Sequence, residues 1–275
     1  MIWGLEDVRV TFGRRAALDC VTVPVEPSRI TVVVGGDGAG KSTCLRTLVG
    51  LLEPRSGIVR RPAKERTGYV PATAGLYTDL TVQENLDFCA DAYRLAAAER
   101  GPRQTEILER TGLAAARHRL GGQLSGGMQR KLAVGLALLH SPDMLVLDEP
   151  TTGVDPVSRA ELWRLISGAA ARGTAVAVAT TYVNEAARGS SVVLLEAGQV
   201  LASGSPDDIL RGVPGAVGSA RGRARPGTRS WRRGADWRVW APDGGLPDGI
   251  ARVRPDFEDA VVVAALAGEE KAGER

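Results

Sequence analysis

The pattern of apolar and polar positions predicts strands and helices in alternation over the first 210 residues. Every second residue is apolar in two stretches between residues 5 and 25, which is typical of strands. An unbroken apolar run from Ile30 to Val34 predicts a third strand, and residues 41–52 have the apolar spacing of a helix. Such an alternation is typical of a mostly parallel sheet with helices packed on it.

The middle of the chain is predicted to be largely helical, and its helices have recognisable start signals. Thr81 and Glu84 form a capping box that opens a helical stretch reaching about Leu120. Ser125 is placed to cap the next helix, and Asp155 to cap a later one whose first position is proline. Three short apolar runs, each expected to be a strand, are residues 144–147, 175–179 and 192–195.

The composition of the chain changes after about residue 211. Glycine, proline and arginine become frequent between residues 212 and 249, and three tryptophans are interspersed among them. We therefore expect one domain over residues 1–211 and a small separate appendage over residues 212–275. The appendage is expected to hold two or three short strands and a final helix from about Phe257.

Composition and charge exclude several classes of protein. With 44% hydrophobic and 24% charged residues among 275, the chain is globular in type, not disordered, collagen-like or a disulfide scaffold. A net charge of +3 is too small for the whole protein to be a nucleic-acid binder. The three scattered cysteines form no metal or disulfide pattern, which fits a reducing cytosol. Early charges argue against a signal peptide and the apolar runs are too short to span a bilayer, so we expect any membrane contact to be peripheral.

A glycine-rich stretch after the strand at residues 30–34 matches the phosphate-binding pattern G-x-x-x-x-G-K-[ST] at every fixed position. Glycines in such a loop let backbone N–H groups turn toward phosphate oxygens, and the positive end of the following helix adds to the attraction. Lys41 is expected to reach the β- and γ-phosphates of a nucleotide, and the Ser42 hydroxyl to bind Mg²⁺. The nucleotide-binding residues expected here are Gly35, Gly36, Asp37, Gly38, Ala39, Gly40, Lys41, Ser42 and Thr43.

Two carboxylates follow the apolar strand expected at residues 144–147. Asp148 is placed to hold Mg²⁺ through water, and Glu149 to act as the general base that polarises an attacking water. Strands often end in aspartate, so the pair alone is a moderate signal. Downstream of a phosphate-binding loop, it becomes a strong indication of nucleotide hydrolysis.

The segment Leu-Ser-Gly-Gly-Met-Gln-Arg at residues 124–130 is the most diagnostic one in the chain. Its serine and glycines open a predicted helix, where backbone N–H groups, a hydroxyl and the helix dipole attract an anion. The segment resembles the signature motif of ATP-binding-cassette (ABC) ATPases, and the resemblance covers residues 5–210 almost continuously. It implies that ATP in the phosphate-binding loop of a partner cassette is contacted by Ser125, Gly126, Gly127 and Gln129.

The resemblance also implies a fold. We expect an α/β protein of the P-loop NTPase type, with a mostly parallel sheet, an antiparallel β-subdomain, an inserted helical subdomain of about residues 81–135 and a small C-terminal α+β appendage. Phe12 matches the aromatic that stacks on adenine in this family, the alternative being a strand residue that faces the core. Residues 152–156 resemble the loop that crosses to the partner's site. Residues 253–261 resemble the closing segment of drug-efflux cassettes of the daunorubicin-resistance type, which indicates an exporter branch.

Two positions depart from the family pattern. Ala72 stands where the family has a glutamine that reaches Mg²⁺ and the attacking water, and Thr181 where it has a histidine that contacts the γ-phosphate. His118 and His140 lie in other segments, at expected surface or helix-end positions, and do not substitute. Loss of one such contact typically costs about 10²–10³ in rate. We therefore expect ATP and Mg²⁺ to bind, but hydrolysis at this site to be weak, an arrangement that suits a heterodimer with a second, competent cassette.

Two function classes are open on the sequence. In the first, the chain is the ATP-binding subunit of an ABC exporter, held at the cytoplasmic face of the membrane by a transmembrane permease. In the second, it is a non-transport cassette that acts on ribosomes or RNA through its tail, where seven arginines and three tryptophans lie between residues 221 and 240. The tail can also be a solvated face over a tryptophan core, or a contact for lipid head groups. A single phosphate-binding loop favours the exporter, without a specific nucleic-acid partner.

Overall fold

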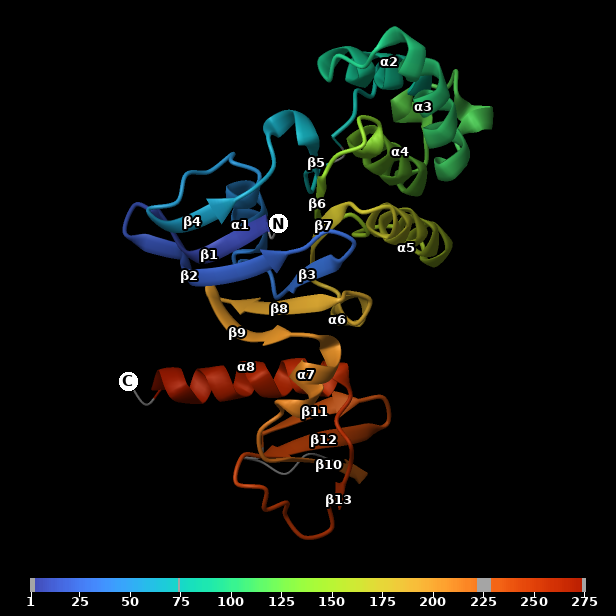
Figure 1. Cartoon of the computed structure of the whole chain (residues 1–275). Coiled ribbons are helices and arrows are strands. Elements are labelled where there is room, and N and C mark those ends of the chain that lie inside the picture. The colour runs from blue at the N-terminus through green and yellow to red at the C-terminus, as the bar shows by residue number, and fades with distance from the viewer. Residues whose placement is uncertain (1–2, 74, 222–228, 274–275) are drawn as a thin grey trace.

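A six-stranded sheet, with strands in the order β5-β6-β7-β3-β8-β9, lies at the centre of the protein (Figure 1). The first five strands in that order are parallel, and β9 runs antiparallel to β8. The computed structural model describes residues 3–73, 75–221 and 229–273. The strands of this sheet are β3 (Ile30–Val34), β5 (Thr67–Val70), β6 (Met144–Asp148), β7 (Ala175–Thr180), β8 (Ser191–Glu196) and β9 (Gln199–Gly204).

Strand β3 shows why the central strands have unbroken apolar runs. Val33 packs in the core on one face of the sheet, whereas Val32 and Val34 pack in the core on the other. A strand that is covered on both faces needs apolar residues at every position. The mostly parallel sheet expected from the sequence is thus confirmed, and its burial explains the pattern that predicted it.

One face of the central sheet is covered by α1 and by a three-stranded antiparallel sheet of order β2-β1-β4. The elements are β1 (Trp3–Phe12), β2 (Arg15–Val25), α1 (Lys41–Leu48) and β4 (Ser56–Arg60). Helix α1 lies between the two sheets and buries Cys44, Leu45 and Leu48 there. This sheet is the antiparallel β-subdomain that we expected.

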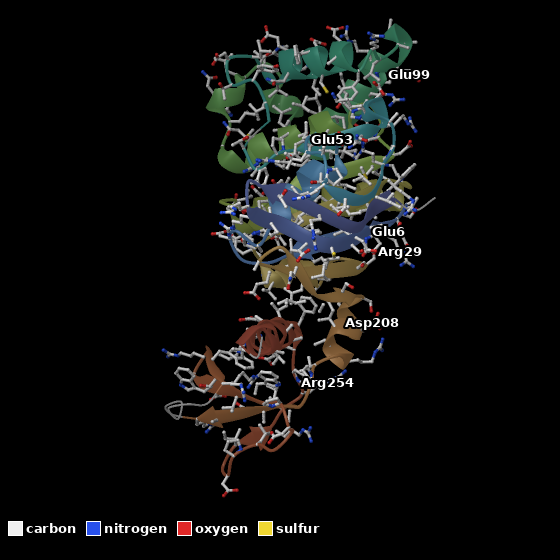
Figure 2. All side chains as sticks on the ribbon, turned by 90° about the vertical axis from the view of Figure 1, so that its left-hand side faces the viewer. Glu6, Arg29, Glu53, Glu99, Asp208 and Arg254 are labelled. Carbon is white, nitrogen blue, oxygen red and sulfur yellow. The ribbon has the colours of Figure 1, made fainter. Side chains whose placement is uncertain are left out.

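Helices cover the opposite face and extend into an arm beyond the sheet (Figure 1). They are α2 (Val82–Ala92), α3 (Ala97–Thr111), α4 (Gly126–Leu138) and α5 (Pro156–Ala171). The predicted capping box is complete at the start of α2, because the Thr81 N–H donates to Glu84 Oε2 (2.7 Å) and the Glu84 N–H donates to Thr81 Oγ1 (3.1 Å). Figure 2 shows the arm from the side, with Glu99 near its outer end.

The C-terminal appendage is an antiparallel sheet of order β11-β12-β10-β13 packed against the last helix. After the short helices α6 (Val183–Ala186) and α7 (Pro206–Arg211), its elements are β10 (Ala216–Arg221), β11 (Ser230–Arg233), β12 (Asp236–Ala241), β13 (Ala251–Arg252) and α8 (Phe257–Gly273). Helix α8 begins at the predicted residue, but the described part of the sheet has four strands where two or three were expected. The two residues of β13 are too few to give an alternating pattern.

Tryptophans form much of the core of this appendage. Trp240 is 3% exposed and packs with Val217 and Val263, and its indole N–H donates to the Pro214 carbonyl oxygen at 2.8 Å. Trp231 packs against the same cluster. The tail therefore has the tryptophan core that the sequence left as one of three alternatives.

Helix α8 runs alongside β9, which is an edge strand of the central sheet (Figure 1). A Cβ atom on Gly268 would lie 3.0 Å from Leu201 Cδ2, so helix and strand approach closely at this glycine. Ala260 belongs to the same core cluster as β3 and β8. The appendage packs on the first domain and shares part of its core. The domain boundary expected near residue 211 therefore stays a prediction. None of the described helices is long and apolar enough to cross a membrane.

The position of His140 differs in part from our expectation. It follows the end of α4, as expected, but it is 6% exposed, so a surface position is wrong. Its ring stacks on that of Tyr93, which caps the end of α2, with centroids 3.6 Å apart and an interplanar angle of 6°. Burial lowers the pKa of His140 to about 4.

Candidate functional site

The glycine-rich loop joins the end of β3 to the start of α1, as the sequence pattern requires. Gly35 lies so close to β8 that a Cβ atom there would be 2.1 Å from the carbonyl oxygen of Leu195. Gly40, the N-cap of α1, has a φ of 107°, a conformation that residues with side chains rarely adopt. The backbone therefore requires glycine at both positions, and the loop brings the N–H groups of the first turn of α1 to the surface of a cavity described below.

Lys41 is buried beside this loop, with 5% of its surface exposed. Its ammonium group donates to the carbonyl oxygen of Gly36 at 2.9 Å and lies 3.4 Å from Glu149 Oε1. The lysine thus connects the loop with the carboxylate that follows β6. This contact fixes a positive charge where the pattern expects the phosphates of a nucleotide.

Ser42 and Asp148 form the second contact between the loop and β6. The Ser42 hydroxyl donates to Asp148 Oδ1 at 3.1 Å, and Asp148 is fully buried. Burial raises the pKa of Asp148, and the hydrogen bond from Ser42 opposes that shift. The other carboxylate oxygen, Oδ2, has no hydrogen-bond partner among the residues that the structure describes. A hydroxyl beside an unsatisfied buried carboxylate oxygen is a donor set that fits Mg²⁺.

Glu149 has a strained backbone, with a φ of 47° in the left-handed region. Its N–H donates to the Ala179 carbonyl oxygen at 3.0 Å, and the Thr152 hydroxyl donates to its Oε2 at 3.0 Å. Lys41 approaches the other carboxylate oxygen. The carboxylate is therefore held on two sides at the end of β6, where it can accept a proton from a water that attacks a bound phosphate.

Most of the predicted nucleotide-binding residues line one cavity of about 570 Å³. The lining residues are Phe12, Arg15, Ala16, Ala17, Asp37, Gly38, Gly40, Lys41, Ser42, Thr43, Glu149, Ala197 and Gly198. Gly35, Gly36, Ala39 and Asp148 lie outside that lining, where they shape the loop or hold Ser42.

Phe12 borders this cavity and is 55% exposed, so the alternative interpretation of it as a core-facing strand residue is wrong. It is the last residue of β1, and the chain turns into β2 directly after it. An exposed aromatic face next to a phosphate-binding loop is suited to stack on a nucleotide base.

Sequence reasoning missed two parts of the cavity wall, residues 15–17 of β2 and the turn between β8 and β9. Ala197 and Gly198 have φ angles of 46° and 79°, which is typical of a tight hairpin turn. The Gly198 N–H donates to the Ala39 carbonyl oxygen at 2.9 Å, and the Gly198 carbonyl oxygen accepts the Asp19 N–H at 2.8 Å. An Ala-Gly pair between two apolar runs predicts such a hairpin, but nothing local in it points to the phosphate-binding loop.

The signature residues lie apart from this cavity. Ser125 caps α4 by accepting the Met128 N–H at 3.3 Å, and Gln129 donates to the Gly121 carbonyl oxygen at 3.0 Å. Ser125 and Gly126 are exposed, whereas Gly127 is buried so close to α5 that a Cβ atom would be 2.5 Å from Ser158 Oγ. Helix α4 and helix α1 pack on opposite faces of the central sheet, and no signature residue lines the cavity beside the phosphate-binding loop.

The two positions that depart from the family pattern lie on loops beside the site. Ala72 is exposed, and its carbonyl oxygen accepts a hydrogen bond from Arg130 Nη2 at 2.5 Å. Burial lowers the pKa of Arg130, and the nearby carboxylates of Glu149 and Asp148 oppose that shift. Thr181 follows the end of β7, and its side chain makes no hydrogen bond with the described part of the chain.

This geometry defines a nucleotide-binding site of the P-loop type, and comparisons with known proteins agree. A family model described as ABC transporter matches residues 18–152. The chain is 40% identical over 210 residues to the probable multidrug ABC transporter ATP-binding protein YbhF of Escherichia coli K12, a match that covers 73% of this chain but 36% of that protein. It is 33% identical to the Nod factor export ATP-binding protein I of Cupriavidus metallidurans, over 75% of this chain and 72% of that protein.

Solved structures give the same result. An ATP-binding subunit of an ABC transporter superposes with a TM-score of 0.70 at 31% identity, over 77% of this chain and 92% of that one. A dimeric ATP-binding cassette in a post-hydrolysis state, with ADP and phosphate bound, superposes with a TM-score of 0.65 at 25% identity, over 74% of this chain. The chain belongs to the ABC transporter family, as one of its ATP-binding cassettes.

Proposed function

We propose that the chain is the ATP-binding subunit of an exporter, in which ATP binding and hydrolysis between two cassettes drive transport by a transmembrane permease. The observation that carries the proposal is the cavity lined by Phe12, Lys41, Ser42 and Glu149, with the signature residues exposed elsewhere on the surface. A site divided in this way is complete only when a second cassette supplies its signature. Relatives named for multidrug transport and for Nod factor export support an exporter.

The second cassette is proposed to differ from this chain. Ala72 and Thr181 lack the side chains that the family uses at the γ-phosphate, so this chain's own ATP site is expected to hydrolyse slowly. Ser125 to Gln129 retain the complete signature. In a homodimer both sites would be impaired, whereas a heterodimer would combine this signature with a competent partner.

Magnesium is expected to bind with ATP at Ser42 and Asp148. The ion would neutralise charge on the β- and γ-phosphates. Lys41 would hold the same phosphates, Glu149 would take the proton from the attacking water, and Phe12 would orient the base. The complex is expected at the cytoplasmic face of the membrane, with this chain as a peripheral subunit.

The alternative that the tail acts on ribosomes or other RNA is not favoured by its described arginines. Arg233 pairs with Asp256 and, at 2.5 Å, with Glu258, while Arg238 lies 3.4 Å from the buried Asp259. These carboxylates neutralise the positive charge of Arg233 and Arg238, which would otherwise attract the phosphates of RNA. Arg223 and Arg225 lie outside the described residues.

Purification of the tagged chain from membranes tests the proposal. Mass spectrometry of the complex should find a permease and a second, different cassette, and the complex should hydrolyse ATP. Lys41→Ala is the control: it should abolish ATP binding to this chain while the subunits of the complex are still recovered together. Recovery of ribosomal proteins and RNA in place of membrane subunits would support the alternative function instead.

A further inference from the structure

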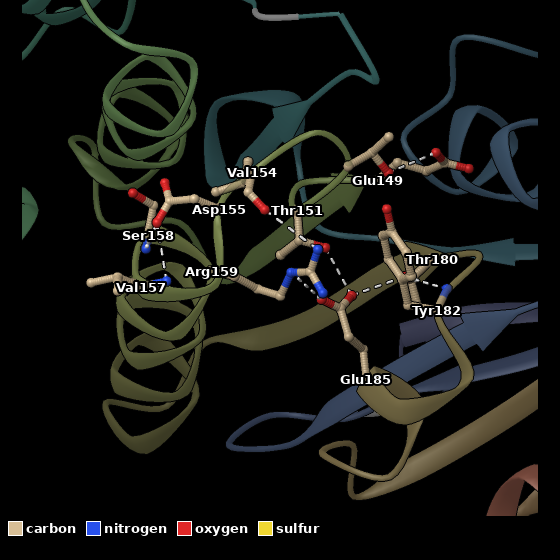
Figure 3. Close-up of polar contacts among 11 residues, drawn as sticks. Glu149, Thr151, Val154, Asp155, Val157, Ser158, Arg159, Thr180, Tyr182 and Glu185 are labelled. Atoms are coloured by element: carbon tan, nitrogen blue, oxygen red, sulfur yellow. Dashed lines mark hydrogen bonds and ion pairs between the residues drawn. The ribbon is translucent and has the colours of Figure 1, made fainter. Parts of the chain in front are cut away.

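One buried carboxylate joins the loops that leave the neighbouring strands β6 and β7 (Figure 3). Glu185 Oε2 accepts the Thr151 hydroxyl at 2.8 Å and the Thr180 hydroxyl at 2.9 Å. All three residues are at most 1% exposed, so water does not compete for these hydrogen bonds. A single oxygen atom therefore holds both loops together.

The two hydroxyls lie close in the chain to Glu149 and Thr181, the two positions that the proposed function connects with hydrolysis. Thr151 is two residues after Glu149, and Thr180 directly precedes Thr181. The Glu149 N–H already donates to the Ala179 carbonyl oxygen, so the two loops begin side by side. The hydrogen bonds from Thr151 and Thr180 to Glu185 add a second connection, between the loop after β6 and the end of β7. Glu185 therefore connects the loop after Glu149 with the segment that carries Thr181.

The second oxygen of the same carboxylate connects these loops to α5. Glu185 Oε1 lies 3.7 Å from Arg159 Nε, in the first turns of that helix. The Arg159 guanidinium also lies 4.7 Å from the centre of the Tyr182 ring and donates to the Val154 carbonyl oxygen at 3.4 Å. Arg159 thus contacts the loops after β6 and β7 at once, as Figure 3 shows.

We propose that Glu185 is a positioning residue for ATP hydrolysis. It does not line the nucleotide cavity, so it acts through the loops that carry Glu149 and Thr181. Its removal would leave two buried hydroxyls without an acceptor and Arg159 without its carboxylate partner, and both loops would lose their fixed spacing. The proposal takes hydrolysis at this chain's own site as its reaction, and it holds whether that site is slow or fast.

The test compares Glu185→Ala and Glu185→Gln in the full chain, by single-turnover hydrolysis with protein in excess over labelled ATP. ATP affinity and thermal unfolding are measured on the same samples. We expect Glu185→Ala to lower the hydrolysis rate per folded chain at least tenfold, with ATP affinity within about twofold of the parent chain. Glu185→Gln keeps an oxygen that can accept from both threonines, so it should recover most of the rate.

Asp259→Ala is the matched control, because Asp259 is also a fully buried carboxylate next to an arginine but lies in the appendage. It should destabilise the chain without slowing hydrolysis per folded molecule. Glu185 is only structural if its alanine variant slows hydrolysis no more than Asp259→Ala does, or if rate and ATP affinity fall together.

The same Glu185 variants are placed in an Ala72→Gln/Thr181→His chain, where a faster reaction gives a second measurement. Glu185→Ala should cancel most of any gain in that chain. If the double substitution brings no gain, Ala72 and Thr181 are not what limits hydrolysis at this site, while the comparison in the parent chain still decides the role of Glu185.

Discussion

Lys41 and Glu149 form an ion pair between the phosphate-binding loop and the end of β6, with Nζ and Oε1 3.4 Å apart. The same ammonium group donates to the Gly36 carbonyl oxygen. A phosphate that enters the cavity competes with both groups for the lysine. We therefore expect ATP binding to loosen the ion pair, which frees the glutamate for a water molecule.

The first prediction is that the isolated chain binds Mg-ATP but turns it over slowly. Lys41→Ala should abolish binding, because it removes the positive charge fixed in the cavity. Lys131→Ala is the control, since Lys131 pairs with Glu161 away from the site at 2.7 Å, and it should leave affinity unchanged. Titration calorimetry and a phosphate-release assay measure the two quantities. Turnover of several per second by the chain alone would contradict a degenerate site.

A second prediction concerns the two departures from the family pattern. Ala72→Gln combined with Thr181→His should raise hydrolysis at this site at least tenfold, because each restores a contact to the transition state. The two gains need not multiply, since residues that act as a unit are not additive. Single-turnover rates of the two single variants and the double variant measure this. If no gain appears, another feature of the loop, such as Gly36-Asp37, limits the reaction.

The third prediction compares both halves of the composite site in the assembled complex. Ser125→Arg should remove most of the ATPase activity, because it places a bulky side chain at the helix start that serves the partner's ATP. It should leave this chain's own ATP affinity nearly unchanged, since Ser125 does not line the cavity. Glu149→Gln should have a much milder effect on the complex. Equal damage from the two substitutions would rule out the asymmetric heterodimer.

The fourth prediction is a loss of stability in mild acid that depends on His140. Between pH 6.5 and about 4 the unfolded chain binds a proton at this histidine and the folded chain does not, so the free energy of unfolding falls as the pH falls. A lowering of the pKa from 6.5 to about 4 corresponds to about 3 kcal/mol, fully lost below pH 4. His140→Phe keeps the stacking on Tyr93 and should remove this part of the pH dependence. Urea unfolding at pH 7.5, 6 and 5 measures it, and parallel curves for both proteins would show that His140 does not contribute.

Short-range signals in the sequence predicted much of the fold and of the site. The loop from Gly35 to Ser42 has fixed positions that the backbone itself requires, and Thr81 with Glu84 forms a capping box within four residues. The central strands are buried on both faces, so their apolar runs are unmistakable. These features depend on residues that are close in the chain, and a pattern can therefore identify them.

Contacts between distant segments could not be predicted in the same way. The bond from Gly198 to the Ala39 carbonyl oxygen joins residues that are far apart in the chain, and the sequence around either of them says nothing of the other. His140 was expected at the surface or at a helix end; it does follow the end of α4, but the ring of Tyr93, which lies far from it in the chain, stacks on it. Glu185 lies shortly after Thr181, and nothing in its local sequence indicates a partner as distant as Thr151. Its proposed role depends on hydrogen bonds with Thr151 and Thr180, which only the fold brings together.

The place of α8 beside β9 has a consequence for the solubility of the chain. An edge strand has a row of unpaired backbone N–H and C=O groups, which is a template for another strand. The helix lies along this strand, where Ala264 and Leu201 pack against the core cluster that contains Ala260. We expect it to hinder another strand from adding to β9. A chain cut after residue 211 would keep every nucleotide-binding residue but leave this edge open. Such a truncated protein should self-associate through strand addition even while its ATP site is intact, and that outcome would show that the appendage protects this edge.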